Sequence, residues 1–201
     1  MTDEGFDPAL PRCSWSGAAG PRPDPVMVRY HDEEWGTPCH DDIDLFERLA
    51  LESFQAGLSW STILRKRDGF RAAFRGFDPG VVGAFGPVDV DRLMADASIV
   101  RNRAKIDATI GNAHGWLQLA GAYGSADAYF AAMVPPPPKT LDASVGVGGI
   151  PDRTPESDAL SADLRRRGFK FVGSTIMYAY MQSVGLVDDH VAGCVRYRGG
   201  R

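Results

Sequence analysis

The sequence predicts an all-α protein, a bundle of about eight to ten short helices. Two observations support this class. Apolar residues recur at helical spacing in most segments, and each such segment is bounded by a capping residue or a glycine. In contrast, no stretch alternates apolar and polar residues over several positions, as a half-buried strand does. The chain has 201 residues, enough to bury one core without disulfides. We therefore expect a single helical domain over residues 12–197, after a flexible N-terminal tail at residues 1–11.

The first half of the chain supplies clear start and stop signals. Residues 1–25 are rich in Pro, Gly and Ser and read as coil, except for an ordered turn around Trp15. Asp41 or Asp42 can cap a helix, Gly57 ends it, and Ser59 can cap the next one. The expected helices of this half span Tyr30–Gly36, Asp42–Ala56, Trp60–Arg67, Phe70–Arg75, a segment from Asp78, and Asp89–Ala95.

The second half continues in the same way around one irregular connection. Its expected helices span Arg103–Leu119, Ser125–Met133, Ser157–Arg167 and Ser174–Val184. Residues 134–153 hold the tract Pro135–Pro138 and three glycines, a composition that suits neither a helix interior nor a central strand. A stiff surface linker is the favoured interpretation of the proline tract, and a recognition ligand is the alternative.

Composition limits the class of function. The 22 basic and 26 acidic residues give a formal net charge of −4, which argues weakly against a nucleic-acid partner. Three basic clusters, at 65–67, 101–105 and 165–170, could nevertheless form a local basic face. Three cysteines make a complete disulfide framework improbable. No apolar run reaches the ~18 residues of a membrane helix, and the acidic start is unlike a signal peptide. We expect a cytoplasmic protein without a membrane partner.

A metal site is one interpretation of the cysteines and histidines. His190 and Cys194 are spaced as half of a site, and Cys13 and His31 could complete it, with Cys39–His40 as a competing pair. Two Cys and two His suit a closed, structural Zn²⁺ site that would join the N- and C-terminal segments. Alternatively, the cysteines are small buried apolar residues and hydrogen bonds satisfy the histidines. Spacing alone leaves both interpretations open.

Glu52 lies on a mostly apolar helix, and three of the four tryptophans fall in the first 60 residues. In one interpretation Glu52 faces solvent and Trp60 belongs to the core. In the other, Glu52 is a recognition carboxylate in an aromatic pocket formed by Trp15, Tyr30, Trp35 and Trp60. Flat rings with one hydrogen-bond acceptor suit an extruded base or a cationic ring.

The segment Gly168–Gly173 predicts a hairpin between two helices. Its glycines and the following helix start can present consecutive backbone N–H groups, and such groups bind phosphate. Arg165–Arg167 and Lys170 lie beside it. Together these residues favour a side of the molecule that faces DNA.

Several of these segments together resemble the DNA-3-methyladenine glycosylase I family. They are Cys-Ser-Trp at 13–15, Tyr-His-Asp-Glu-Glu-Trp-Gly at 30–36, Leu-Glu-Ser-Phe-Gln-Ala-Gly-Leu-Ser-Trp at 51–60, Arg-Asn-Arg-Ala-Lys-Ile at 101–106, and Gly-Phe-Lys-Phe-Val-Gly-Ser-Thr at 168–175, followed by His190 and Cys194. The match runs in order from about residue 12 to residue 197.

The resemblance implies a helix-hairpin-helix glycosylase that flips 3-methyladenine out of alkylated double-stranded DNA and hydrolyses its N-glycosidic bond. It implies one structural Zn²⁺, with Cys39 left free, and a monomer that releases free 3-methyladenine. The implied catalytic residue is Glu52, with Tyr30, Trp60, Trp15 and Trp35 around the base. The implied zinc ligands are Cys13, His31, His190 and Cys194, and the implied DNA-binding residues are Lys170, Phe171, Val172, Gly173 and Ser174.

Departures from the family pattern qualify this expectation. Met27 stands where some members have a further pocket tyrosine. Asp188 stands where some members have Asn and other helix-hairpin-helix glycosylases have a catalytic Asp, so it is either catalytic or a helix cap. The hairpin reads Phe-Lys-Phe-Val-Gly rather than the Gly-rich form. Ser174–Thr175 stand where strand-cleaving relatives carry a lysine, which predicts base removal without strand cleavage.

Two other functions remain open at this stage. A zinc-stapled DNA-binding module without catalysis would need the hairpin and the basic clusters but not the aromatic pocket. A glycosylase with another main substrate, such as 3-methylguanine, is compatible with Met27 in place of tyrosine.

Overall fold

The helices begin at residues whose side chains can cap them. In the computed structural model, which describes residues 6–19, 22–136 and 138–199, Asp41 accepts hydrogen bonds from the N–H groups of Ile43 and Asp44. Ser59 accepts from Thr62, and Asn102 caps the longest helix. The α-helices in the described residues are α1 (Pro25–Glu33), α2 (Asp42–Gln55), α3 (Trp60–Arg65), α4 (Arg67–Ala73), α5 (Pro79–Gly83), α6 (Pro87–Ala95), α7 (Arg103–Tyr123), α8 (Ala126–Met133), α9 (Pro155–Arg166) and α10 (Ser174–Ser183).

The predicted all-α class is confirmed as a mostly helical fold, and the differences lie at element ends. The helix predicted from Tyr30 is the second half of α1, which begins at Pro25, because proline is tolerated in a first helical turn. The long helix α7 continues past Leu119 to Tyr123 and ends at Gly124, whose φ is +89°. Three 3₁₀ turns complete the helical elements of the described chain: η1 (Ser14–Ser16), η2 (Arg75–Phe77) and η3 (Val147–Gly149).

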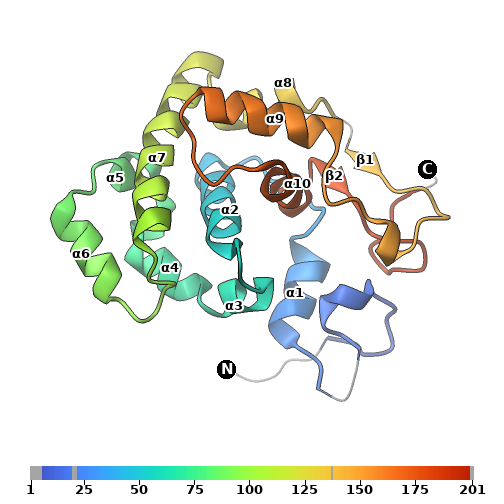
Figure 1. The fold of residues 1–201 in the computed structure, drawn as a ribbon. Helices are drawn as coiled ribbons and strands as arrows, with labels where there is room; N and C mark the ends of the chain where they lie inside the picture. The colour runs from blue at the N-terminus through green and yellow to red at the C-terminus, as the bar shows by residue number, and fades with distance from the viewer. Residues whose placement is uncertain (1–5, 20–21, 137, 200–201) are drawn as a thin grey trace.

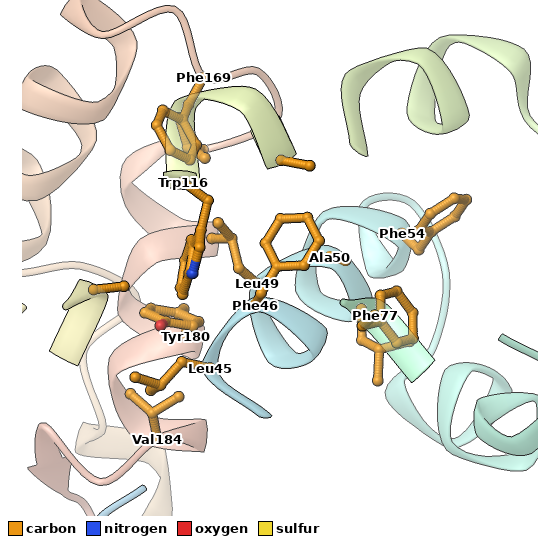
Figure 2. Packing of buried hydrophobic residues seen from close by; sticks show 14 of the residues in the cluster. Leu45, Phe46, Leu49, Ala50, Phe54, Phe77, Trp116, Phe169, Tyr180 and Val184 are labelled. Carbon is orange, nitrogen blue, oxygen red and sulfur yellow. The ribbon is translucent and has the colours of Figure 1, made fainter. Parts of the chain in front are cut away.

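Helix α2 lies at the centre of the molecule, with α4, α5 and α6 on one side and α1 on the other (Figure 1). Helix α10 packs against α2 and α9, and α7 packs against α5 and α8. The main core forms around one face of α2, where Phe46 and Phe54 are almost fully buried. Figure 2 shows Phe46 beside Trp116 of α7, and Tyr180 of α10 belongs to the same cluster. Replacing a buried Phe of this kind by Ala costs about 3–5 kcal/mol, so α2 holds a rigid position.

A short parallel ladder in the irregular connection is a feature that the sequence pattern did not predict. Strand β1 (Lys139–Thr140) pairs with β2 (Val187–Asp188). Two-residue strands leave no alternating pattern to detect, and their pairing is long-range. The ladder fastens residues 134–153 to the segment after α10. Pro137, within the predicted proline tract, lies outside the described residues.

The N- and C-terminal segments meet beside α1. The N–H of Val195 donates to the carbonyl of Pro11 at 2.8 Å. Around this contact lies a second apolar cluster, made of Cys13, Tyr30, Trp35, Leu64, Val191 and Cys194. Residues 1–5 of the predicted tail lie outside the described residues. No helix in the described ranges is both long and apolar enough to cross a membrane.

Candidate functional site

A pocket of about 390 Å³ opens between η1, α1, α2, α3 and α10. Five predicted residues contribute to its wall: Trp15, Tyr30, Trp35, Glu52 and Trp60. The structure therefore brings the whole predicted base-binding set together from four different segments. The remaining lining residues are Met27, Gln55, Ile150, Ala179 and Gln182.

Aromatic rings form one continuous wall. The Tyr30 ring centroid lies 5.2 Å from that of Trp60 and 6.3 Å from that of Trp15. Trp15 in turn contacts Trp35 edge-on at 4.7 Å. The interplanar angles of these three pairs run from 55° to 68°, so the rings surround a volume and do not fill it by stacking on one another. Such a wall accommodates a flat ring, and it attracts a cationic ring more strongly than a neutral one.

Glu52 is buried, with 4% of its surface exposed, so the alternative that it faces solvent is wrong. It lies on the pocket side of α2, and its carboxyl group forms no hydrogen bond with the described residues. Burial raises the pKa of Glu52 to about 8, against which the positive charge of Arg48 acts only in part. A carboxylate is stable there only when a positive charge or hydrogen-bond donors enter the pocket.

Tyr30 is also buried. Its pKa is raised, first by burial and then by the negative charge of Glu52. The phenol therefore stays protonated and keeps an O–H group that can donate a hydrogen bond to a ligand.

A second buried carboxylate, that of Asp189, holds a side chain that lines the pocket. Asp189 Oδ2 accepts a hydrogen bond from the Tyr178 hydroxyl at 2.6 Å and one from Gln182 Nε2 at 2.7 Å. Burial raises the pKa of Asp189, and these two hydrogen bonds oppose that effect. Of the three side chains, Gln182 is the one that also lines the pocket.

Three of the four predicted metal ligands form one buried cluster. The ligand atoms of Cys13, His31 and Cys194 all lie within 4.8 Å of one another. Cys194 Sγ is 3.4 Å from His31 Nε2. The hydrogen bond from Cys13 lowers the pKa of Cys194 and raises that of Cys13, because two adjacent thiols do not both ionise without a positive charge between them.

The fourth predicted ligand, His190, lies next to this cluster but outside it. Its ring centroid is 4.8 Å from that of His31. Its Nδ1 donates to Asp188 Oδ1 at 2.6 Å, and its buried Nε2 has no hydrogen-bond partner among the described residues. Asp188 does not cap a helix, as one alternative supposed, but lies in β2, and it is absent from the pocket lining. Its role in the structure is to orient His190.

The predicted hairpin is held by side chains from three helices. Asn112 of α7 accepts from the N–H of Lys170 at 2.8 Å and donates to its carbonyl at 3.0 Å. The Ser53 hydroxyl of α2 lies 3.1 Å from the carbonyl of Phe171, and Ser161 of α9 donates to the carbonyl of Val172 at 2.7 Å. The carbonyls of three successive hairpin residues are thus turned toward the protein.

The outer side of the hairpin is accessible. Lys170 is exposed, Phe171 is half-buried with a φ of +55°, and Val172 is buried. Gly173 precedes α10, whose start has no side-chain cap. The first N–H groups of such a helix have no intrahelical partner. The exposed side chain of Arg165 lies near Gly173, directly before these groups.

The predicted basic face is smaller than the sequence suggested. Arg67 is half-buried and forms ion pairs with Glu34 and Glu47, with N···O distances of 2.5 and 2.9 Å. Lys105 is buried and donates to two carbonyls at the end of α2. Charge clusters in a sequence do not reveal which members have internal partners. Arg165–Arg167 and Lys170 are exposed near the hairpin, as are Arg101 and Arg103 at the start of α7. Arg166 and Arg167 form ion pairs with Asp163.

A family model described as methyladenine glycosylase matches residues 20–197 of this chain. The chain belongs to the methyladenine glycosylase family. It is 46% identical over 192 residues to DNA-3-methyladenine glycosylase 1 of Escherichia coli strain K12, covering 96% of this chain and 100% of that protein. The predicted resemblance is thereby confirmed.

Solved structures of 3-methyladenine DNA glycosylase I match the fold. The protein from Staphylococcus aureus, in a structure that concerns its recognition of 3-methyladenine, aligns with a TM-score of 0.87 at 34% identity, over 95% of this chain and 100% of that one. A tyrosine-to-phenylalanine variant in complex with 3-methyladenine aligns with a TM-score of 0.83 at 37% identity, over 87% and 93% of the two chains.

In this methyladenine glycosylase family member, sequence reasoning missed four of the pocket residues: Gln55, Ile150, Ala179 and Gln182. Gln182 left a weak signal, since it is a polar residue between Met181 of α10 and Val184, the apolar residue directly after that helix. Ile150 left none, because it lies in the irregular connection and reaches the pocket through tertiary folding.

Proposed function

We propose that this protein is a DNA glycosylase that flips 3-methyladenine out of alkylated double-stranded DNA and hydrolyses its N-glycosidic bond. The observation that carries the proposal is the buried carboxyl group of Glu52 at an aromatic pocket of about 390 Å³. This combination serves a flat, positively charged ring better than it serves a neutral base.

The chemistry asks little of the protein. A base methylated at N3 carries a positive charge while it is attached to the sugar. When the glycosidic bond breaks, the bonding electrons pass to the base, which departs neutral, and water adds to the sugar. Glu52 reads the edge of the base and favours its cationic form, Trp60 stacks on it, and Tyr30 donates a hydrogen bond. Selectivity then arises from pocket shape and from the weak bond of the lesion.

The hairpin holds the DNA backbone in this proposal. Residues 168–174 between α9 and α10 form the helix-hairpin-helix element, and the N–H groups at the start of α10 bind phosphate. The carbonyls of Lys170, Phe171 and Val172 and the N–H of Lys170 are engaged inside the protein, so the phosphate would be bound by the N–H groups that follow Lys170. Lys170 and Arg165 add positive charge at the surface.

We also propose one structural Zn²⁺, held by Cys13, His31, His190 and Cys194. The donor set supports this proposal. Cys13, His31 and Cys194 already form a cluster, and the Nε2 atom of His190 is buried without a hydrogen-bond partner in the described chain. Both histidines donate through Nδ1 to a carboxylate, which leaves Nε2 for a metal, the arrangement usual around zinc. A closed four-ligand site has no open position for substrate, so the ion would stabilise the segment that carries Trp15.

Base removal without strand cleavage follows from the residue after the hairpin. Ser174, in the first turn of α10, hydrogen-bonds Ser157 at 3.0 Å and also bonds Asp158. A hydroxyl group has no nitrogen with which to form the imine that an amine nucleophile forms with the sugar. The aromatic pocket favours the glycosylase over the alternative of a DNA-binding module without catalysis, which would have no use for it.

The test is release of free bases from DNA treated with a methylating agent, resolved by chromatography. Wild type should release 3-methyladenine, and Glu52→Ala should bind free 3-methyladenine more weakly by at least about 1 kcal/mol in calorimetry. Glu33→Ala, at an exposed position of α1, is the matched control. DNA binding without any base release would replace the glycosylase with the binding module.

A further inference from the structure

Gln182 is the polar pocket residue with a fixed orientation. Its side chain lines the pocket, and its Nε2 donates to Asp189 Oδ2 at 2.7 Å. Asp189 is 3% exposed and receives a second hydrogen bond at the same oxygen from Tyr178. Both donors thus converge on one buried acceptor, which determines which end of the Gln182 amide points toward it.

This anchoring decides what Gln182 can offer a ligand. A primary amide has one acceptor oxygen and two N–H donors on its nitrogen. One N–H is donated to Asp189, which fixes the nitrogen end of the amide against the protein. The other end of the amide carries the oxygen Oε1, to which the described residues donate no hydrogen bond. A side chain that lines the pocket and is held by its nitrogen therefore acts as a hydrogen-bond acceptor for whatever occupies the pocket.

We propose that Gln182, held by Asp189, is a specificity-determining residue that accepts a hydrogen bond from the exocyclic amine of a bound 3-methylated purine. Adenine carries an amine donor at this position of its edge, whereas guanine carries an acceptor oxygen. An acceptor fixed at this position favours adenine, whereas the oxygen of guanine would find no donor there. Sites built around such hydrogen bonds discriminate strongly. The inference rests on the proposed function and names the substrate feature that the pocket reads.

Gln182 also differs in kind from Glu52. Glu52 responds to the charge of the ring, which every base methylated at N3 carries in DNA. Gln182 responds to the substituent on the ring, which distinguishes adenine from guanine. The proposal therefore closes the choice, left open by Met27, between 3-methyladenine and 3-methylguanine as the main substrate.

The experiment is a double-mutant cycle in which one change removes the Gln182 amide and the other removes the amine of the ligand. Free 3-methyladenine and 3-methylpurine, which lacks the amine, are titrated into wild type and Gln182→Met, and binding is followed by quenching of tryptophan fluorescence. Wild type should prefer 3-methyladenine, and the substitution should reduce that preference about tenfold, the scale of one hydrogen bond in a buried site. Gln118→Met, the same change at an exposed position of α7, should leave the preference unchanged.

A second variant keeps the proposal testable if Gln182→Met unfolds. Asp189→Asn preserves the shape of the anchor but lets the Gln182 amide rotate, so the preference for the amine should fall here too while 3-methylpurine binds as before. An equal loss of affinity for both ligands would show a merely structural role and overturn the inference, as would an unchanged preference. A wild type that binds neither ligand and releases no 3-methyladenine would instead contradict the proposed function.

Discussion

Replacing Glu52 by Gln should make the protein more stable at neutral pH, although it damages the pocket. Glu52 is 4% exposed, and burial raises its pKa from 4.5 to about 8. In the unfolded chain the group loses its proton at much lower pH. Raising the pH between these two values therefore favours the unfolded state, which releases the proton more readily. The neutral amide of Gln has the same shape and does not ionise.

The size of the effect follows from the two pKa values. Each pKa unit is worth about 1.36 kcal/mol, so the full cost of burying this carboxyl group, reached above pH 8, is about 5 kcal/mol. The linkage relation gives a cost of about 1.4 kcal/mol at about pH 5.5 and about 3.9 kcal/mol at about pH 7.5. The free energy of unfolding of the variant should thus gain about 2.5 kcal/mol on wild type across this range.

Urea unfolding of both proteins, followed by circular dichroism, measures this difference directly. All other titrating groups, including the two clustered thiols, are shared by the two proteins and cancel when their stabilities are subtracted. The exposed Glu33→Gln is the matched control, and a similar pH dependence there would assign the effect to net charge. A difference between Glu52→Gln and wild type that stays flat from about pH 5.5 to about pH 8 would refute the reasoning.

Three further predictions concern the segments around the pocket. Metal analysis should give one Zn²⁺ per chain for wild type and for Cys39→Ser and none for Cys194→Ser; a metal-free wild type of full stability would contradict the site. Asn112→Ala removes two hydrogen bonds to the hairpin backbone, so DNA affinity in fluorescence anisotropy should fall about tenfold while binding of free 3-methyladenine holds; equal losses in both would refute it. Lys105→Met leaves two carbonyls at the end of α2 without their buried donor and should cost about 2–3 kcal/mol in urea unfolding; a change below about 0.5 kcal/mol would exclude that role.

Local features of the fold could be predicted from the sequence, because their causes are local. Asp41 and Ser59 cap α2 and α3 as expected, since a capping side chain bonds N–H groups only two or three residues away. The family segments also located the pocket aromatics. The pairing of β1 with β2 was beyond such reasoning, because it joins residues 139–140 to residues 187–188.

The sequence could not predict which charged residues are buried or which groups they pair with. The sequence shows that Glu52 is a carboxylate on an apolar helix, but its burial depends on residues of other segments that line the same pocket, such as Tyr30 and Trp60. Likewise, Lys105 and Arg67 belong to basic clusters in the sequence, yet both point inward to acceptors far away along the chain. Partners of this kind are set by packing between helices, so no local pattern announces them.

Adjacent residues of α2 connect the two halves of the proposed site. Glu52 faces the pocket, and the next residue, Ser53, shares its one hydroxyl proton between the carbonyls of Leu49 at 2.9 Å and Phe171 at 3.1 Å. Phe171 adopts a left-handed φ of +55°, which costs a non-glycine residue about 1 kcal/mol or more. A glycosylase must keep a flipped base at a fixed distance from the backbone it grips. Because one buried helix holds both the carboxyl group and the hairpin carbonyl, that distance is set by the core, and a loosened hairpin should displace the base relative to Glu52 even where no pocket residue has changed.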